Sequence, residues 1–196
     1  MGTTRLKHSS RTFGLILALL VPLAAMASSD ALCQTDEVVK YNCVTGKKVA
    51  SLCAAPASGE VQALTYRFGT REKVELEFVA APDNGKSFSA FTQQVDPRAR
   101  INQVWFDRGN IRYLMTECVG GNCTSDGRLA VVRGDKLVMN AQCRNPIADP
   151  PGFSRDLVQF GPGSEGARSF SRLLKWEEAA NPVEELYQPE ARKRVD

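Results

Sequence analysis

The sequence predicts a mainly β protein: an antiparallel meander of eight or nine short strands, closed as a sandwich or barrel, with a short helical C-terminal extension. Three observations lead to this fold class. Runs of alternating apolar and polar residues follow one another between Asp36 and Cys143, glycine-containing turns separate them, and six cysteines are spread along the chain. A meander of more than 100 residues is long enough to enclose one core.

The first four predicted strands form two pairs. Residues 38–43 and 48–53 are rich in apolar and β-branched side chains and flank a short turn that contains a glycine, which is typical of a hairpin. Residues 64–68 and 74–78 have the clearest two-residue period of the chain, and a glycine begins the turn between them. Each of these strands therefore has one apolar face for the core.

Two further hairpins complete the predicted meander. Residues 101–106 pair with residues 111–115 about the turn Asp107-Arg-Gly-Asn110. Residues 129–132 pair with residues 137–139 about another glycine-containing turn. Short strands joined by tight turns favour antiparallel pairing over strand–helix–strand units, which need long crossover connections.

The composition changes after Cys143. Two stretches rich in proline and glycine, residues 145–152 and 161–166, are typical of loops. We therefore predict a β-domain over residues 28–144 and an extension over residues 145–196, which we expect to pack on the β-domain.

Two short helices are predicted in the extension. Phe170, Leu173 and Leu174 have the spacing of one helical face, and we expect this helix to run to about Ala180. A second helix is expected to begin at Asn181, because Asn181 is a suitable N-cap and proline and glutamate follow at the positions where they favour a helix start.

Residues 1–27 have the features of a signal peptide. Three basic residues precede an uninterrupted apolar run, and Ala25-Met-Ala27 provides a small-residue cleavage site. The apolar run is shorter than the roughly 20 residues that a membrane span needs. We therefore expect export to the periplasm or the extracellular space, with no transmembrane segment after cleavage.

The cysteines agree with export. All six follow the expected cleavage site, and an even number in an exported chain is typical of disulfides. Cys118 and Cys123 are the first expected pair, because they flank a Gly-Gly turn. We expect the other four to form two bridges that tie the first strands to the last. These four are Cys33, Cys43, Cys53 and Cys143.

Charge and histidine content exclude several function classes. The predicted signal peptide holds three of the 25 basic residues, none of the 22 acidic residues and the only histidine, His8. The mature chain is therefore formally neutral, so it lacks the long-range attraction that nucleic-acid binding needs. Without histidine it has no Ser–His or Cys–His nucleophile pair and no histidine metal ligand. We expect no cofactor and no metal ion.

Paired carboxylates remain as a catalytic alternative, as in enzymes that cleave polysaccharides. Glu75 and Glu77 point to the same side of one predicted strand, since they are two residues apart. The alternative interpretation is that they are the solvated polar face of an amphipathic strand, where alternation requires polar residues anyway.

A group of arginines and aromatic residues is a candidate ligand patch, with ordinary surface charges as the alternative interpretation. These residues fall on the third hairpin and just before it. They are Arg98, Arg100, Trp105, Arg108, Arg112 and Tyr113.

The first hairpin resembles that of the bacterial periplasmic inhibitors of C-type lysozyme. The likeness lies in Val39-Lys-Tyr-Asn-Cys43 followed by Gly46-Lys47, and it covers about residues 37–53. It implies a β-barrel with a Ser-Gly loop and a following tyrosine that enter the lysozyme cleft. Here Ser58-Gly59 is followed by Glu60, so no inhibitory residue is transferred to this chain. This chain is also longer, and its extension has no counterpart in those inhibitors.

The expected function is that of an exported binding module that recognises a protein or an envelope component, including inhibitor or immunity-type proteins. It follows from export, a stapled β-meander and the lack of a catalytic motif. An enzyme that acts on envelope polysaccharide through carboxylates is the alternative.

Overall fold

The structure is a computed structural model. It describes residues 31–56, 60–121, 127–145 and 170–181, together with Gly2, Cys123, Gly152, Phe153 and Leu157. The predicted signal peptide, apart from Gly2, the Ser58-Gly59 pair and the predicted helix beyond Asn181 lie outside the described residues.

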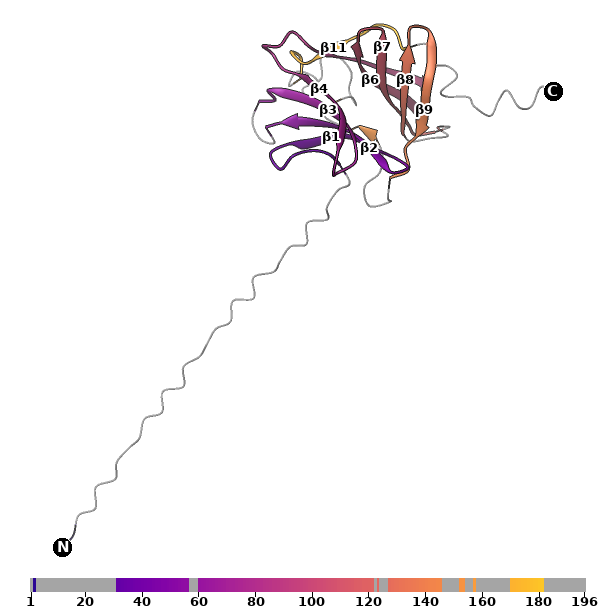
Figure 1. The fold of residues 1–196 in the computed structure, drawn as a ribbon. Coiled ribbons are helices and arrows are strands. Elements are labelled where there is room, and N and C mark those ends of the chain that lie inside the picture. The colour runs from indigo at the N-terminus through magenta and orange to yellow at the C-terminus, as the bar shows by residue number, and fades with distance from the viewer. Residues whose placement is uncertain are drawn as a thin grey trace.

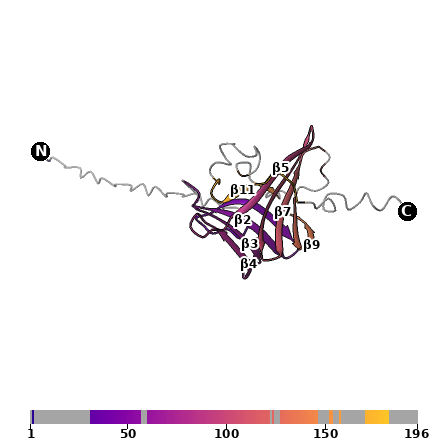
Figure 2. The same cartoon turned by 90° about the horizontal axis from the view of Figure 1, so that it is seen from above.

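The described strands form two sheets (Figures 1 and 2). The first sheet has the order β10-β1-β2-β3-β4. Its strands are β1 (Val38–Thr45), β2 (Lys48–Ala55), β3 (Ala63–Gly69), β4 (Val74–Ala80) and β10 (Gly152–Phe153). Neighbouring strands in this sheet are antiparallel, and both predicted hairpins of this half of the meander are confirmed.

The second sheet has the order β11-β5-β6-β7-β8-β9. Its strands are β5 (Phe88–Asp96), β6 (Ala99–Arg108), β7 (Ile111–Val119), β8 (Gly127–Arg133), β9 (Lys136–Gln142) and β11 (Leu174–Trp176). The pairs from β5 to β9 are antiparallel, as the predicted hairpins require, while β11 runs parallel to β5. No strand was predicted at β5, because Ser89, Gln93 and Gln94 interrupt its apolar pattern.

Both sheets bury one face in a common core. Leu52 and Tyr66 of the first sheet and Met115 of the second sheet all belong to this core and are at most 1% exposed. Phe106 of the second sheet contacts two aromatic rings of the first sheet. The centroid of its ring lies 4.2 Å from that of Phe78 and 5.0 Å from that of Tyr66. Because side chains alternate along a strand, the neighbours of Phe106 on β6, Trp105 and Asp107, project from the opposite face of the second sheet.

The buried phenol of Tyr66 predicts a loss of stability in alkali. Burial, together with the charge of nearby Tyr113, raises the pKa of Tyr66 far above its ordinary value of 10.0. Above about pH 10 the unfolded chain therefore releases a proton that the folded chain keeps, so this contribution is complete below pH 10 and declines as the pH rises. We expect the free energy of unfolding of Tyr66→Phe, measured in urea between pH 9 and 11.5, to fall less steeply with pH than that of the unaltered protein. The two slopes should differ by up to about 1.4 kcal/mol per pH unit. Equal slopes would contradict this.

All six cysteines form disulfides, and no helix among the described residues has the length and apolar character to cross a membrane. Cys118–Cys123 confirms the predicted pair, and Cys43–Cys143 ties β1 to the residue after β9, as predicted. The prediction that the remaining bridge also reaches the last strands is wrong, because Cys33 lies beside β2 and pairs with Cys53. The Cys118–Cys123 turn needs its glycine at position 120. Gly120 has a φ of +84°, and a Cβ there would lie 2.2 Å from the carbonyl oxygen of Arg98.

The segment before β1 crosses the outer face of the first sheet. The Cys33–Cys53 disulfide fixes it to β2, and the backbone N–H of Leu32 donates to the hydroxyl of Ser51 at 2.9 Å. Arg67 of β3 donates two hydrogen bonds to the Glu37 carboxylate, at 2.5 and 3.0 Å. Both side chains are at most 7% exposed, so this ion pair is buried between the segment and the sheet.

The predicted helix over residues 170–180 is wrong. Phe170–Leu173 forms a single turn closed by hydrogen bonds to the Phe170 carbonyl, and the chain then extends as β11. The apolar spacing reflects burial, since Phe170, Leu173 and Leu174 are at most 2% exposed in the core. One turn is enough to bury all three, and pairing with β5 then satisfies the backbone of β11.

Candidate functional site

Two adjoining hollows lie beside the second sheet, lined by residues that include Ser89 of β5, Trp105 of β6 and Glu177 directly after β11. The smaller, called here the Asn181 hollow, has a volume of about 320 Å³ and is lined by Arg112 and Asn181 among others. The larger, called the Arg108 hollow, has a volume of about 840 Å³. Four residues line both hollows and form the wall between them. They are Ser89, Trp105, Asp107 and Glu177.

Arg112 organises the Asn181 hollow. It faces Asp107 across the β6–β7 hairpin and donates two parallel hydrogen bonds to its carboxylate, at 2.8 and 2.9 Å. Its guanidinium also lies over the ring of Trp105, 5.5 Å from the centroid. The hydrogen bond to Asp107 raises the pKa of Arg112 against the opposing effect of burial, and the charges of Asp107 and Glu177 raise it further.

Asn181 has a buried amide group with unused hydrogen-bonding capacity. It is 8% exposed, its backbone N–H donates to Gln103 at 2.9 Å, and its side-chain oxygen accepts a hydrogen bond from Arg112. Within the described part of the chain, its Nδ2 atom has no hydrogen-bond partner. Such an atom in a native structure requires an explanation, because a buried donor without an acceptor is costly.

Glu177 is placed by the parallel pairing of β11. Its backbone N–H donates to the carbonyl of Ala90 at 2.8 Å, directly after β11 ends. Its carboxylate accepts a hydrogen bond of 2.9 Å from the hydroxyl of Ser89. The strand pairing that replaced the predicted helix therefore places this carboxylate at the hollows.

The structure divides the predicted arginine and aromatic patch. Trp105 and Arg112 join the Asn181 hollow, and Arg108 lines the adjoining one. Tyr113 lies on the opposite face of the sheet, where its ring stacks on Phe106 in the core at 4.9 Å. Arg98 and Arg100 lie at the other end of β6 from Arg108.

Glu75 and Glu77 form separate ion pairs on the first sheet. Glu75 accepts a hydrogen bond from Lys48 at 2.7 Å and Glu77 accepts one from Arg67 at 2.9 Å. Of the two, Glu77 lines the Arg108 hollow. Their arrangement fits the interpretation as the polar face of an amphipathic strand.

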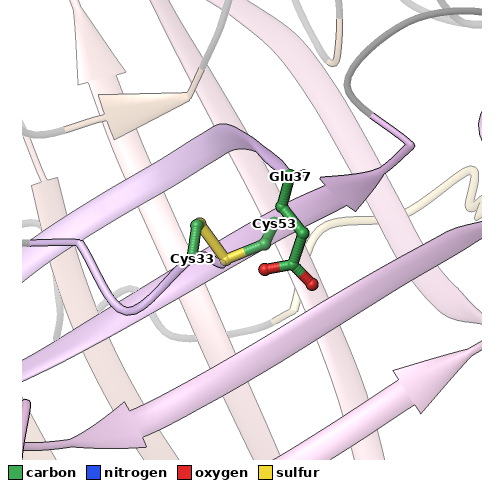
Figure 3. Close-up of side chains that lie close together, drawn as sticks. All are labelled: Cys33, Glu37 and Cys53. Carbon is green, nitrogen blue, oxygen red and sulfur yellow. A yellow bond between two sulfur atoms is a disulfide. The ribbon is translucent and has the colours of Figure 1, made fainter. Parts of the chain in front are cut away.

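Cys33, Glu37 and Cys53 bring three possible metal-ligand atoms within 4.8 Å of one another (Figure 3). The two sulfur atoms are bonded to each other, so neither is a thiolate that binds metal. The carboxylate is held by the buried ion pair with Arg67. The arrangement is that of a structural staple.

Asp107, Glu177 and Asn181 were not predicted to lie near Trp105. Asp107 and Arg112 flank the predicted turn at residues 107–110, so the hairpin register alone would have placed them opposite each other. Glu177 and Asn181 were assigned to predicted helices, and no local pattern links them to a strand more than 70 residues earlier.

The chain was compared with protein-family models, with curated proteins and with solved structures, and none of the three comparisons found a match.

Proposed function

We propose that the protein is an exported binding module that holds an envelope component in the two adjoining hollows. The observation that carries this is the Asn181 amide, a buried donor without a partner in the described structure, at the wall of a polar hollow. Export is supported by the three disulfides and by the signal-peptide pattern of residues 1–27.

Rigid placement of the polar groups supports binding. Asp107, Arg112 and Asn181 are fixed by hydrogen bonds to one another, and two of them stand on paired strands. Groups held in this way lose little freedom when a ligand arrives, so more of the contact energy appears as affinity. A volume of several hundred cubic ångströms is also typical of small-ligand sites.

The finer fold assignment is also a proposal. Contacts between Phe78 of the first sheet and Phe88 and Phe106 of the second, at centroid distances of 5.1 and 4.2 Å, support two layers packed face to face. The described strands are ordered in two separate sheets. A β-sandwich is therefore favoured over a barrel.

Binding is tested through Trp105, which with Trp176 makes up the two tryptophans of the chain. In a Trp176→Phe background, peptidoglycan fragments from a lysozyme digest are expected to shift the emission of Trp105, because this side chain lines both hollows. Asn181→Ala is expected to weaken this binding by about fivefold to thirtyfold, since loss of one hydrogen bond costs about 1–2 kcal/mol.

Asn140→Ala is the matched control, because Asn140 is an exposed amide on β9 outside both hollows. The proposed site would be contradicted if no fragment changes the Trp105 emission. It would also be contradicted if the fragments change this emission equally in the Asn181→Ala variant. Inhibition of C-type lysozyme, measured in parallel, would support the inhibitor version of the binding function.

A polysaccharide-cleaving enzyme is the second candidate, because the carboxylates of Asp107 and Glu177 line the same hollows. Glycan turnover that Glu177→Gln abolishes and Glu75→Gln preserves would support it. Glu75 is suited to the control because it pairs with Lys48 and lines neither hollow.

A further inference from the structure

Three cations converge on the Arg108 hollow from separate segments. Lys86 belongs to the β4–β5 connection, Arg108 is the last residue of β6, and Lys175 lies in β11. All three are exposed, and none has an ion pair with another residue of the described structure. By contrast, Lys48, Arg67 and Arg112 have carboxylate partners.

The carboxylates of the same hollow already have donors. Glu77 accepts from Arg67 at 2.9 Å and Asp107 accepts from Arg112 at 2.8 Å, while Glu177 accepts from the Ser89 hydroxyl at 2.9 Å. Neither Arg67 nor Arg112 lines the Arg108 hollow itself. The three cations of the hollow have no ion pair among the described residues, and the contact of Lys86 with the Phe78 ring, 5.8 Å from Nζ to the centroid, leaves its charge able to meet an anion from outside.

The wall between the hollows offers a different chemistry. A carboxylate oxygen accepts more than one hydrogen bond, so Asp107 and Glu177 retain capacity to accept from ligand hydroxyl groups. The unused Asn181 amide offers N–H donors to a ligand oxygen in the adjoining hollow. Phe78 and Trp105 also line the Arg108 hollow, although Trp105 is only 5% exposed and Arg112 lies over its ring.

We infer that the ligand is a saccharide that carries an anionic group. The anion lies among Lys86, Arg108 and Lys175, and the sugar hydroxyls lie along the wall formed by Asp107 and Glu177. This inference rests on the proposed binding function and specifies its ligand class. Neutral sugars lack the group that would engage the three cations, and simple anions lack the hydroxyls.

The test uses calorimetric titration of the oxidised protein with glucose 1-phosphate, glucose 6-phosphate and N-acetylglucosamine 1-phosphate. The neutral sugars and inorganic phosphate are titrated in parallel. At least one sugar phosphate is expected to bind at least tenfold more tightly than both its neutral sugar and inorganic phosphate. Its affinity is expected to fall between 50 and 500 mM NaCl, because exposed charges are screened by salt.

The triple variant Lys86→Gln, Arg108→Gln and Lys175→Gln is expected to lose at least tenfold in affinity for that sugar phosphate. Its charge-matched control replaces three exposed cations that lie in or next to hairpin turns and do not line the hollow, and it is expected to change the affinity less than twofold. The control substitutions are Lys47→Gln, Arg133→Gln and Lys136→Gln.

The outcomes separate this inference from the proposed function. Sugar phosphates that bind no better than their neutral sugars or inorganic phosphate, or that bind the triple variant unchanged, would overturn the anionic-saccharide assignment. If a neutral sugar then binds and Asn181→Ala weakens it, the proposed binding function stands. If none of the sugars or peptidoglycan fragments binds, both proposals fail.

Discussion

Loss of the Cys43–Cys143 disulfide, in the variant Cys43→Ala/Cys143→Ala, is expected to lower the free energy of unfolding by about 4.7 kcal/mol. The bridge joins residues 100 positions apart, so without it the unfolded chain gains the freedom of a very long loop. The bond lies between β1 and the residue after β9, and both cysteines are at most 7% exposed. Urea unfolding of the oxidised protein and the variant measures the difference.

The other two disulfides are the internal comparison. Cys33–Cys53 spans 20 residues and Cys118–Cys123 spans five, for which the same chain-entropy relation gives about 3.3 and 2.1 kcal/mol. The corresponding alanine variants should therefore rank in the order of loop length. A Cys118–Cys123 variant that is destabilised as much as the Cys43–Cys143 variant would show that loop closure is not the main contribution.

Glu37→Gln is expected to destabilise the protein by about 3–5 kcal/mol, because it leaves the Arg67 guanidinium buried without its main counter-charge. The Arg67 side chain is 7% exposed and that of Glu37 is 6% exposed. Burial opposes the charge of Arg67, but the hydrogen bonds and charges of Glu37 and Glu77 outweigh it and raise the pKa of Arg67. Urea unfolding at neutral pH measures the loss.

Glu77→Gln provides a matched control on the same arginine. The Glu77 side chain is 49% exposed, and exposed ion pairs contribute about 0–1 kcal/mol. The double variant Glu37→Leu/Arg67→Met removes both buried charges and is expected to recover most of the stability lost in Glu37→Gln. Equal losses in Glu37→Gln and Glu77→Gln would contradict the buried pair as the stabilising contact.

The hairpins were predictable because their information is local. As predicted, the turn at Gly46 joins β1 to β2, which pair with each other, and the turn after Asp107 joins β6 to β7. In both cases alternation and turn residues specify the register with the next segment of the chain. Strand β5 was not predicted, because Ser89, Gln93 and Gln94 interrupt its apolar pattern.

The candidate site was only partly predictable. Trp105 and Arg112 were identified as ligand-patch residues, and hairpin pairing brings them together at one hollow. Tyr113 was grouped with them, but it follows Arg112 directly on a strand, and neighbouring side chains point to opposite faces. Asn181 reaches the site through Gln103 and Arg112, both distant in sequence.

Residues close together in the chain were enough to predict the four hairpins of the meander and the Cys118–Cys123 bridge. The pairing of Cys33 with Cys53, the course of residues 170–181 and the residues that line the two hollows depend on contacts between segments distant in the chain, so they could not be predicted from local patterns. The apolar spacing of Phe170, Leu173 and Leu174 is compatible with a helix or with one turn before a strand. The free edge of β5 decided between them, because it offers hydrogen-bond partners to the backbone of β11.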